Sequence, residues 1–145
     1  MYPQILLTRQ LKMHGHVNVF DVAKRKRVKL LRHGLSILTS LCWSVDGKQI
    51  ASGNEDGMVV IGMLRVAKEV PFSNLHSSQI NSLAWSQDGK RIASTGLDGA
   101  VCIWDPSTGE ELVKIKLSNA GAWQLGWSAD GQRLAATDGA GSIYT

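Results

Sequence analysis

Residues 84–105 form the segment AWSQDGKRIASTGLDGAVCIWD, which shows the strand pattern of the chain most clearly. Each of its two Asp-Gly pairs predicts a tight turn between runs of apolar and β-branched residues, so the stretch contains three successive antiparallel strands. A fourth strand is expected at 110–117, where EELVKIKL alternates polar and apolar residues. Its lysines suit an exposed outer edge, since charge there discourages edge-to-edge pairing.

The same pattern recurs along the chain with a period of 42 residues. The segments LCWSVDGKQIASGNEDG (41–57), LAWSQDGKRIASTGLDG (83–99) and LGWSADGQRLAATDGAG (125–141) align without a gap. A weaker copy of VCIWD (101–105) lies two periods earlier as VNVFD (17–21). A period of this length is typical of proteins in which each repeat forms one supersecondary unit.

With four short strands per unit, and with His76 to Asp105 matching its signature nearly throughout, the chain resembles the WD40-repeat family. The resemblance implies an all-β fold, a β-propeller of four-stranded antiparallel blades. We expect one domain over 1–145, composed of a partial blade at 1–33, blades at 34–75 and 76–117, and a partial blade at 118–145. Closed propellers have about four to eight blades. About three and a half blades therefore predict an incomplete or open ring, either a fragment of a longer propeller or a homo-oligomer that completes it.

The resemblance also implies a buried hydrogen-bond chain in the third unit. The matching residues are Asp98, His76, Ser94 and Trp104. An indole only donates, a hydroxyl and an imidazole can donate and accept, and a carboxylate only accepts, so such a chain leaves no buried polar group unpaired. The serine lies within a predicted strand, which favours a structural role over a catalytic triad. The other units retain fewer of these residues, so we expect only one blade to be locked in this way.

Relatives of this family use the loops at one face of the propeller for interaction, and function belongs to such loops rather than to the fold. The matching positions lie at the start of the innermost strand and between the second and third strands. They are Thr39, Glu55, Gln79, Asn81, Leu97 and Trp123, with Ile37 and Gly121 beside them. Trp123 replaces a polar residue of the other units. It is either a hot spot for a partner or a filler beside small neighbours, and the sequence leaves both open.

Basic residues are concentrated near the N-terminus. Residues 1–33 hold eight Lys and Arg against one acid, whereas residues 34–145 hold eight against eleven. The basic segment 24–32 contains Lys24, Arg25, Lys26, Arg27, Lys29 and Arg32. The repeat alignment places it on a hairpin and an outer edge strand, which favours a solvated, edge-protecting role over a nuclear-localisation signal or a phosphate contact. The segment contains no aromatic residues, so nucleic acid is the less favoured partner.

The remaining features predict neither catalysis nor a cofactor. Cys42 and Cys102 do not have zinc-finger spacing and are expected to be buried, reduced thiols. No apolar run approaches the roughly 20 residues of a membrane span, and no catalytic or metal-binding set stands out. We therefore expect a non-catalytic WD40 scaffold that binds other proteins in the cytoplasm, with a nuclear location possible. The alternative is a nucleic-acid-associated or nuclear module that uses residues 24–32.

Overall fold

The computed structural model describes residues 15–32, 36–65, 69–72 and 75–145. Its strands, in chain order, fall into four groups. The first group comprises β1 (His16–Asp21) and β2 (Lys26–Arg32). The second comprises β3 (Leu38–Trp43), β4 (Gln49–Asn54), β5 (Val59–Met63) and β6 (Glu69–Phe72). The third group comprises β7 (Ile80–Trp85), β8 (Ile92–Gly96), β9 (Ala100–Trp104) and β10 (Glu111–Lys116). The fourth comprises β11 (Ala122–Trp127), β12 (Leu134–Asp138) and β13 (Ile143–Tyr144).

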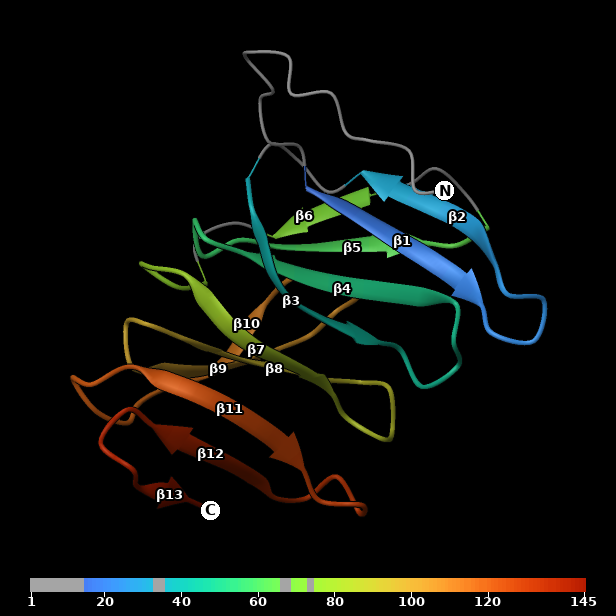
Figure 1. The fold of residues 1–145 in the computed structure, drawn as a ribbon. Helices are drawn as coiled ribbons and strands as arrows, with labels where there is room; N and C mark the ends of the chain where they lie inside the picture. Colours follow the sequence, from blue (N-terminus) through green and yellow to red (C-terminus); the bar gives the residue numbers. More distant parts are fainter. Residues whose placement is uncertain (1–14, 33–35, 66–68, 73–74) are drawn as a thin grey trace, which may run out of the picture.

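Each group forms one antiparallel sheet in which chain neighbours pair (Figure 1). We name these sheets the first blade (β1–β2), second blade (β3–β6), third blade (β7–β10) and fourth blade (β11–β13). In the view of Figure 1 the second, third and fourth blades follow one another from top to bottom, and the first blade lies beside the second. The described sheets form an open arc, not a closed ring, so the fold is all-β and its propeller is incomplete, as the sequence predicts.

The turn after each inner strand explains the Trp-Ser-x-Asp-Gly pattern. In the third blade the Ser86 hydroxyl donates to Asp88 Oδ1 at 2.6 Å and accepts from the Arg91 amide at 3.0 Å. Gly89 adopts φ 74°, a left-handed conformation that favours glycine. The same bonds are made around Ser44 and Ser128, so this turn is set locally by sequence.

A β-bulge recurs near the start of each inner strand. In the second and third blades the extra residues are Thr39 and Asn81, which are skipped when Leu38 pairs with Asn54 and Ile80 with Gly96. In the fourth blade the register shifts between Ala122 and Leu125. A bulge redirects side chains at the end of a strand. The bulge therefore places these residues where one blade meets the next.

The largest apolar core lies between the second and third blades. Ile61 from β5 and Ile92 and Trp104 from the third blade are at most 2% exposed there. Ile80 fits against Gly53, where an added Cβ would lie 2.6 Å from Ile80 Cγ2. A smaller core of Val17, Val19, Leu31 and Ile50 joins the first blade to the second. Both cores are therefore formed by the stacking of successive blades.

The outer strand β10 is exposed along its whole length, as its lysines predict. The described residues form no helix that could cross a membrane. The part of the first predicted unit at residues 1–14 lies outside the described residues.

Candidate functional site

Three of the four residues assigned to the hydrogen-bond chain meet in the third blade. His76 Nδ1 lies 2.9 Å from Asp98 Oδ1, and His76 Nε2 lies 2.8 Å from Ser94 Oγ. Because an ionised carboxylate only accepts, Nδ1 donates to Asp98, and the other ring nitrogen pairs with the Ser94 hydroxyl. Both His76 and Ser94 are buried, so no exposed nucleophile is available. Trp104, the fourth residue, is fully buried on the adjacent strand β9.

Asp98 also closes the turn between β8 and β9. Its Oδ2 accepts from the Ser77 amide at 3.0 Å and its Oδ1 from the Ala100 amide at 3.1 Å. Partial burial by itself would raise the pKa of Asp98, but the bonds from His76 and the two amides lower it below its usual value. Asp98 therefore remains ionised and ties the loop before β7 to this turn.

Sequence reasoning missed the residues that close this turn in the neighbouring blades. Asn54 Oδ1 accepts from the Asp56 and Met58 amides at 3.0 and 2.9 Å. Asp138 Oδ1 accepts from the Ala140 and Ser142 amides at 3.0 and 2.8 Å. Both occupy the same position in the repeat, which is that of Gly96 in the third blade. Asn54 and Asp138 lie 84 residues, or two repeats, apart, and this spacing is the signal that could have revealed them.

The predicted interaction face is assembled by backbone pairing at one end of the inner strands. The residue after each second strand donates its amide to the start of the inner strand of its own blade. Glu55 bonds Ile37 at 3.1 Å, Leu97 bonds Gln79 at 2.9 Å, and Gly139 bonds Gly121 at 3.0 Å. Positions that are far apart in sequence therefore share one rim, which we call the upper rim.

Two of the predicted binding residues are occupied in joining the blades. The Thr39 hydroxyl in the second blade donates to the Ile80 carbonyl of the third. One repeat later, Asn81 Nδ2 donates to the Ala122 carbonyl of the fourth blade at 2.8 Å. Gln79 Nε2 in turn donates to Asn81 Oδ1 at 3.2 Å. These polar side chains therefore stabilise the junctions between blades.

Three large apolar side chains are exposed on the upper rim. Ile37, Leu97 and Trp123 are 44%, 40% and 46% exposed. Leu97 lies beside the start of the fourth blade, since a Cβ added to Gly121 would be 3.6 Å from Leu97 Cδ2. The Trp123 indole nitrogen lies over the next turn, 2.8 Å from a Cβ added to Gly139. Leu97 and Trp123 therefore lie on either side of the start of β11, with the charged Glu55 exposed on the same rim.

The blade geometry agrees with comparisons to known proteins. The family model described as "WD domain, G-beta repeat" matches residues 24–61 and 70–105, more than half of the chain. The chain belongs to the WD40 family. No curated protein matches the sequence.

A solved WD-repeat neighbour supports the same assignment. A chain in the crystal structure of a mitotic checkpoint complex superposes with a TM-score of 0.78 at 25% sequence identity. The match covers 87% of this chain and 40% of that chain, so this chain spans less than half the length of its structural relative. The shared feature is the WD40 propeller architecture.

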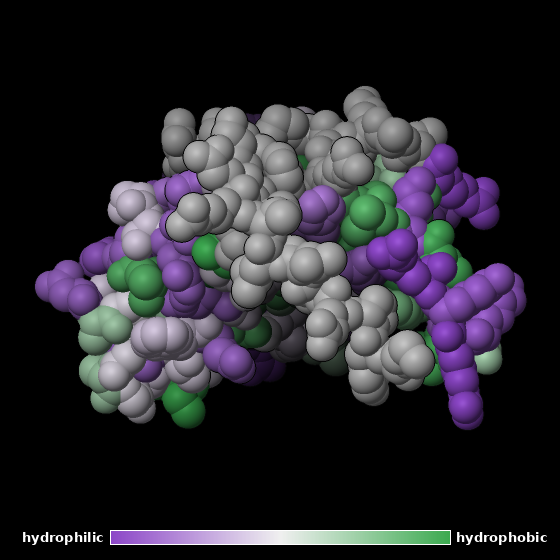
Figure 2. All heavy atoms as spheres, turned by 45° about the horizontal axis from the view of Figure 1, so that its top comes forward, coloured by the Kyte–Doolittle hydropathy of each residue, from purple (hydrophilic) through white to green (hydrophobic). Residues whose placement is uncertain are grey.

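The basic segment of this WD-repeat chain occupies the β1–β2 hairpin and the edge strand β2. In Figure 2 hydrophilic side chains gather on the right, over this hairpin. Lys24 donates its amide to Asp21 Oδ1 at 2.8 Å, and Arg27 Nη1 donates to Asn18 Oδ1 at 3.2 Å. Lys24 to Arg27 are all exposed, Lys29 is half-buried, and Arg25 has a left-handed φ of 51°. Of Arg32 only the backbone is described. The described basic side chains therefore cover the edge of the first blade.

The two cysteines are free thiols in the described structure. Burial raises the pKa of both Cys42 and Cys102 to about 12, so neither is a reactive thiolate at neutral pH. Among the described residues, no group of three or more His, Cys, Asp and Glu side chains is arranged to hold a metal ion.

Proposed function

We propose that this WD-repeat chain is a non-catalytic scaffold that binds another protein through its upper rim. The observation that carries the proposal is the pair of exposed apolar side chains, Leu97 and Trp123, on either side of the start of β11. Large exposed aromatic residues anchor many protein interfaces, and their flat surfaces bury area at a small entropic cost. The polar residues beside them are already bonded within the fold, which rigidifies the surface that a partner would meet.

The proposal is tested with a double variant of the rim and a matched control. Leu97→Ser with Trp123→Ala removes the two anchors, and Leu112→Ser removes a comparably exposed apolar residue, 48% exposed, from strand β10. A photo-crosslinker at Glu55 reports protein contacts at the rim in cells. Loss of the crosslinked species in the double variant, and its retention in Leu112→Ser, supports the proposal. Equal crosslinking in all three proteins contradicts it, provided that their thermal melts agree.

A second copy of the chain is the partner proposed for the open face of the fourth blade. In the third blade, Ala93 and Val101 are 0% and 3% exposed. Their repeat equivalents in the fourth blade, Ala135 and Ile143, are exposed, Ile143 by 73%. Light scattering should show association that grows with concentration and that Ile143→Lys reduces. A monodisperse monomer at all concentrations contradicts this part of the proposal.

The alternative function is a nucleic-acid-associated or nuclear module. It is favoured by the exposed positions of the basic residues Lys24 to Arg27 on a hairpin outside the core. Phosphate binding by such residues is strongly salt-dependent. A fluorescent duplex titrated at two salt concentrations tests it, with Lys24, Arg25, Lys26 and Arg27 changed to Ser as the variant. Salt-sensitive binding that this variant loses supports the alternative, and no binding at low salt excludes it.

A further inference from the structure

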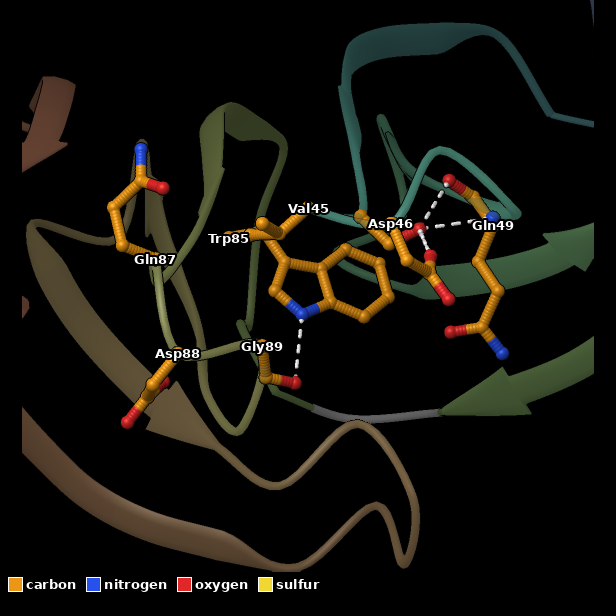
Figure 3. A pocket seen from close by; sticks show the side chains of 8 residues that line it. Val45, Asp46, Gln49, Trp85, Gln87, Asp88 and Gly89 are labelled. Atoms are coloured by element: carbon orange, nitrogen blue, oxygen red, sulfur yellow. Dashed lines mark hydrogen bonds between the residues drawn. The ribbon is translucent and has the colours of Figure 1, made fainter.

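A cavity lies between the second and third blades, at the opposite end of the inner strands from the upper rim (Figure 3). Its volume is about 340 Å³. The side chains that line it belong to the two Trp-Ser-x-Asp-Gly turns and are Ser44, Val45, Asp46, Gln49, Trp85, Gln87 and Asp88, with Gly89. The Trp85 indole stands in the middle, with Asp46 and Gln49 on one side and the Gln87–Gly89 turn on the other.

The equivalent groove between the third and fourth blades is filled by the chain itself. The Arg91 guanidinium lies over the Trp127 ring, with Cζ 4.9 Å from the ring centroid. Arg91 Nη2 donates to the Gly131 carbonyl at 2.7 Å and lies 3.6 Å from Asp88 Oδ2. An aromatic face, a carbonyl and a carboxylate are the three kinds of partner that a guanidinium binds best.

The cavity keeps the counterparts of all three partners but lacks the arginine. Counting back 42 residues, Trp85 replaces Trp127, Asp46 replaces Asp88, and Gly89 replaces Gly131. The position of Arg91 is taken by Gln49. Glutamine is shorter and uncharged, so it can neither stack as a cation on Trp85 nor neutralise Asp46.

The groups that would meet a cation are free enough to do so. The Asp46 side chain is 54% exposed, and its nearest cation, Lys48 Nζ, lies 3.6 Å away on a side chain that is 69% exposed. Such a surface pair is weak and easily exchanged. The hydroxyl of Ser44 and the amide of Lys48 lower the pKa of Asp46, which keeps the carboxylate ionised. The Gly89 carbonyl accepts from Trp85 Nε1 at 3.1 Å and retains a second lone pair.

We propose that this cavity binds the guanidinium group of an arginine side chain presented by a protein partner. The guanidinium stacks on Trp85, donates to the second lone pair of the Gly89 carbonyl and faces Asp46. The two grooves differ in one bond, since Trp85 Nε1 donates to the Gly89 carbonyl whereas Trp127 Nε1 donates to the Ala84 carbonyl. The site is independent of the upper rim, because it lies at the other end of the strands and uses different residues.

The probe for this site is N-acetyl-L-arginine amide, titrated into the whole chain and followed by the indole N–H signals in NMR. The neutral isostere N-acetyl-L-citrulline amide is the matched control ligand. A saturable shift of the Trp85 signal is expected with the arginine probe, and at least about tenfold weaker binding with the citrulline probe, because the charge is lost. Raising the salt concentration should weaken the arginine response, since the site is partly exposed. Equal responses to the two probes would overturn the proposal.

Two reciprocal variants sharpen this test. Gln49→Arg supplies the missing side chain from within and should abolish the Trp85 response. Arg91→Gln empties the second groove and should add a saturable response at Trp127. Asp46→Asn should weaken binding at least about fivefold through loss of the charged partner. Unchanged affinity in both Gln49→Arg and Asp46→Asn contradicts the proposal. If Gln49→Arg does not fold, Asp46→Asn and the citrulline probe decide. Leu97→Ser with Trp123→Ala should leave the response intact, which separates this site from the proposed function.

Discussion

The second and third blades close the same turn with different side chains. In the third blade, Asp98 accepts the amide of Ala100 and is held in place by His76. In the second blade, Asn54 Oδ1 accepts the corresponding amide of Met58. Both arrangements pair the backbone groups of the turn, but one spans three segments of the blade and the other is local.

Gly96 explains why the two arrangements exclude each other. It occupies the repeat position of Asn54, and an added Cβ would lie 2.8 Å from His76 Nδ1 and 3.0 Å from Asp98 Oδ1. The space that Asn54 fills in one blade is taken by the imidazole in the other. The small residue Gly96 therefore leaves the space in which His76, Ser94 and Asp98 form their hydrogen bonds.

The largest effect is expected at Trp104, the fourth residue assigned to the hydrogen-bond chain. Trp104→Ala should lower the free energy of unfolding by about 3–5 kcal/mol, because a fully buried indole leaves a large cavity. Phe20 stands at the same repeat position of the first blade but is 63% exposed. Phe20→Ala should therefore cost no more than about 0.5 kcal/mol. Urea denaturation measures both, and equal losses would show that burial does not distinguish the two positions.

The next largest effect should separate the two turns directly. His76→Ala removes the imidazole partner of the buried Ser94 hydroxyl and one of the bonds to Asp98, and it should lower the free energy of unfolding by about 2–4 kcal/mol. Asn54→Ala removes one acceptor of two amides and should cost only about 1–2 kcal/mol. Chemical denaturation compares them. A larger loss for Asn54→Ala would mean that the local arrangement is the stronger of the two.

A double variant tests whether the arrangements truly compete for space. Gly96→Asn alone should destabilise by about 1–3 kcal/mol, because the new side chain collides with the imidazole. In the His76→Ala background that collision is absent, and the asparagine can take over the turn as Asn54 does. The same substitution should then cost at least about 1 kcal/mol less. Additive losses in a double-mutant cycle would refute this competition.

The smallest effect is expected from pH. The folded-state pKa of Asp98 is lowered, so its contribution to stability is present above the unfolded-state value of about 3.9 and is lost as pH falls through the folded-state value. Thermal melts between pH 7 and pH 2 should show a shallower decline below about pH 4 for Asp98→Asn than for the unchanged chain. Parallel curves would mean that the other turn aspartates account for the acid sensitivity.

Much of the fold was predictable because it is set within short segments. In the third blade β10 lies within one residue of its expected range 110–117, and the strands before it are separated by the two predicted Asp-Gly turns. The partners of His76 were placed by family resemblance. Asn54 and Asp138 were missed because alignment to the third blade compares them with a glycine, which has no side chain to suggest a role.

The 42-residue repeat, the strand order and the Trp-Ser-x-Asp-Gly turns can be predicted from the sequence alone, because they depend on residues a few places apart. Which residues of the upper rim remain exposed depends on how the blades pack. Thr39 and Asn81 look like surface residues in sequence, yet the bulges turn them onto the carbonyls of the next blade. The open groove over Trp85 also depends on how two blades pack. A stacked guanidinium depends on atoms 40 residues apart, whose distances are fixed only when two blades pack together.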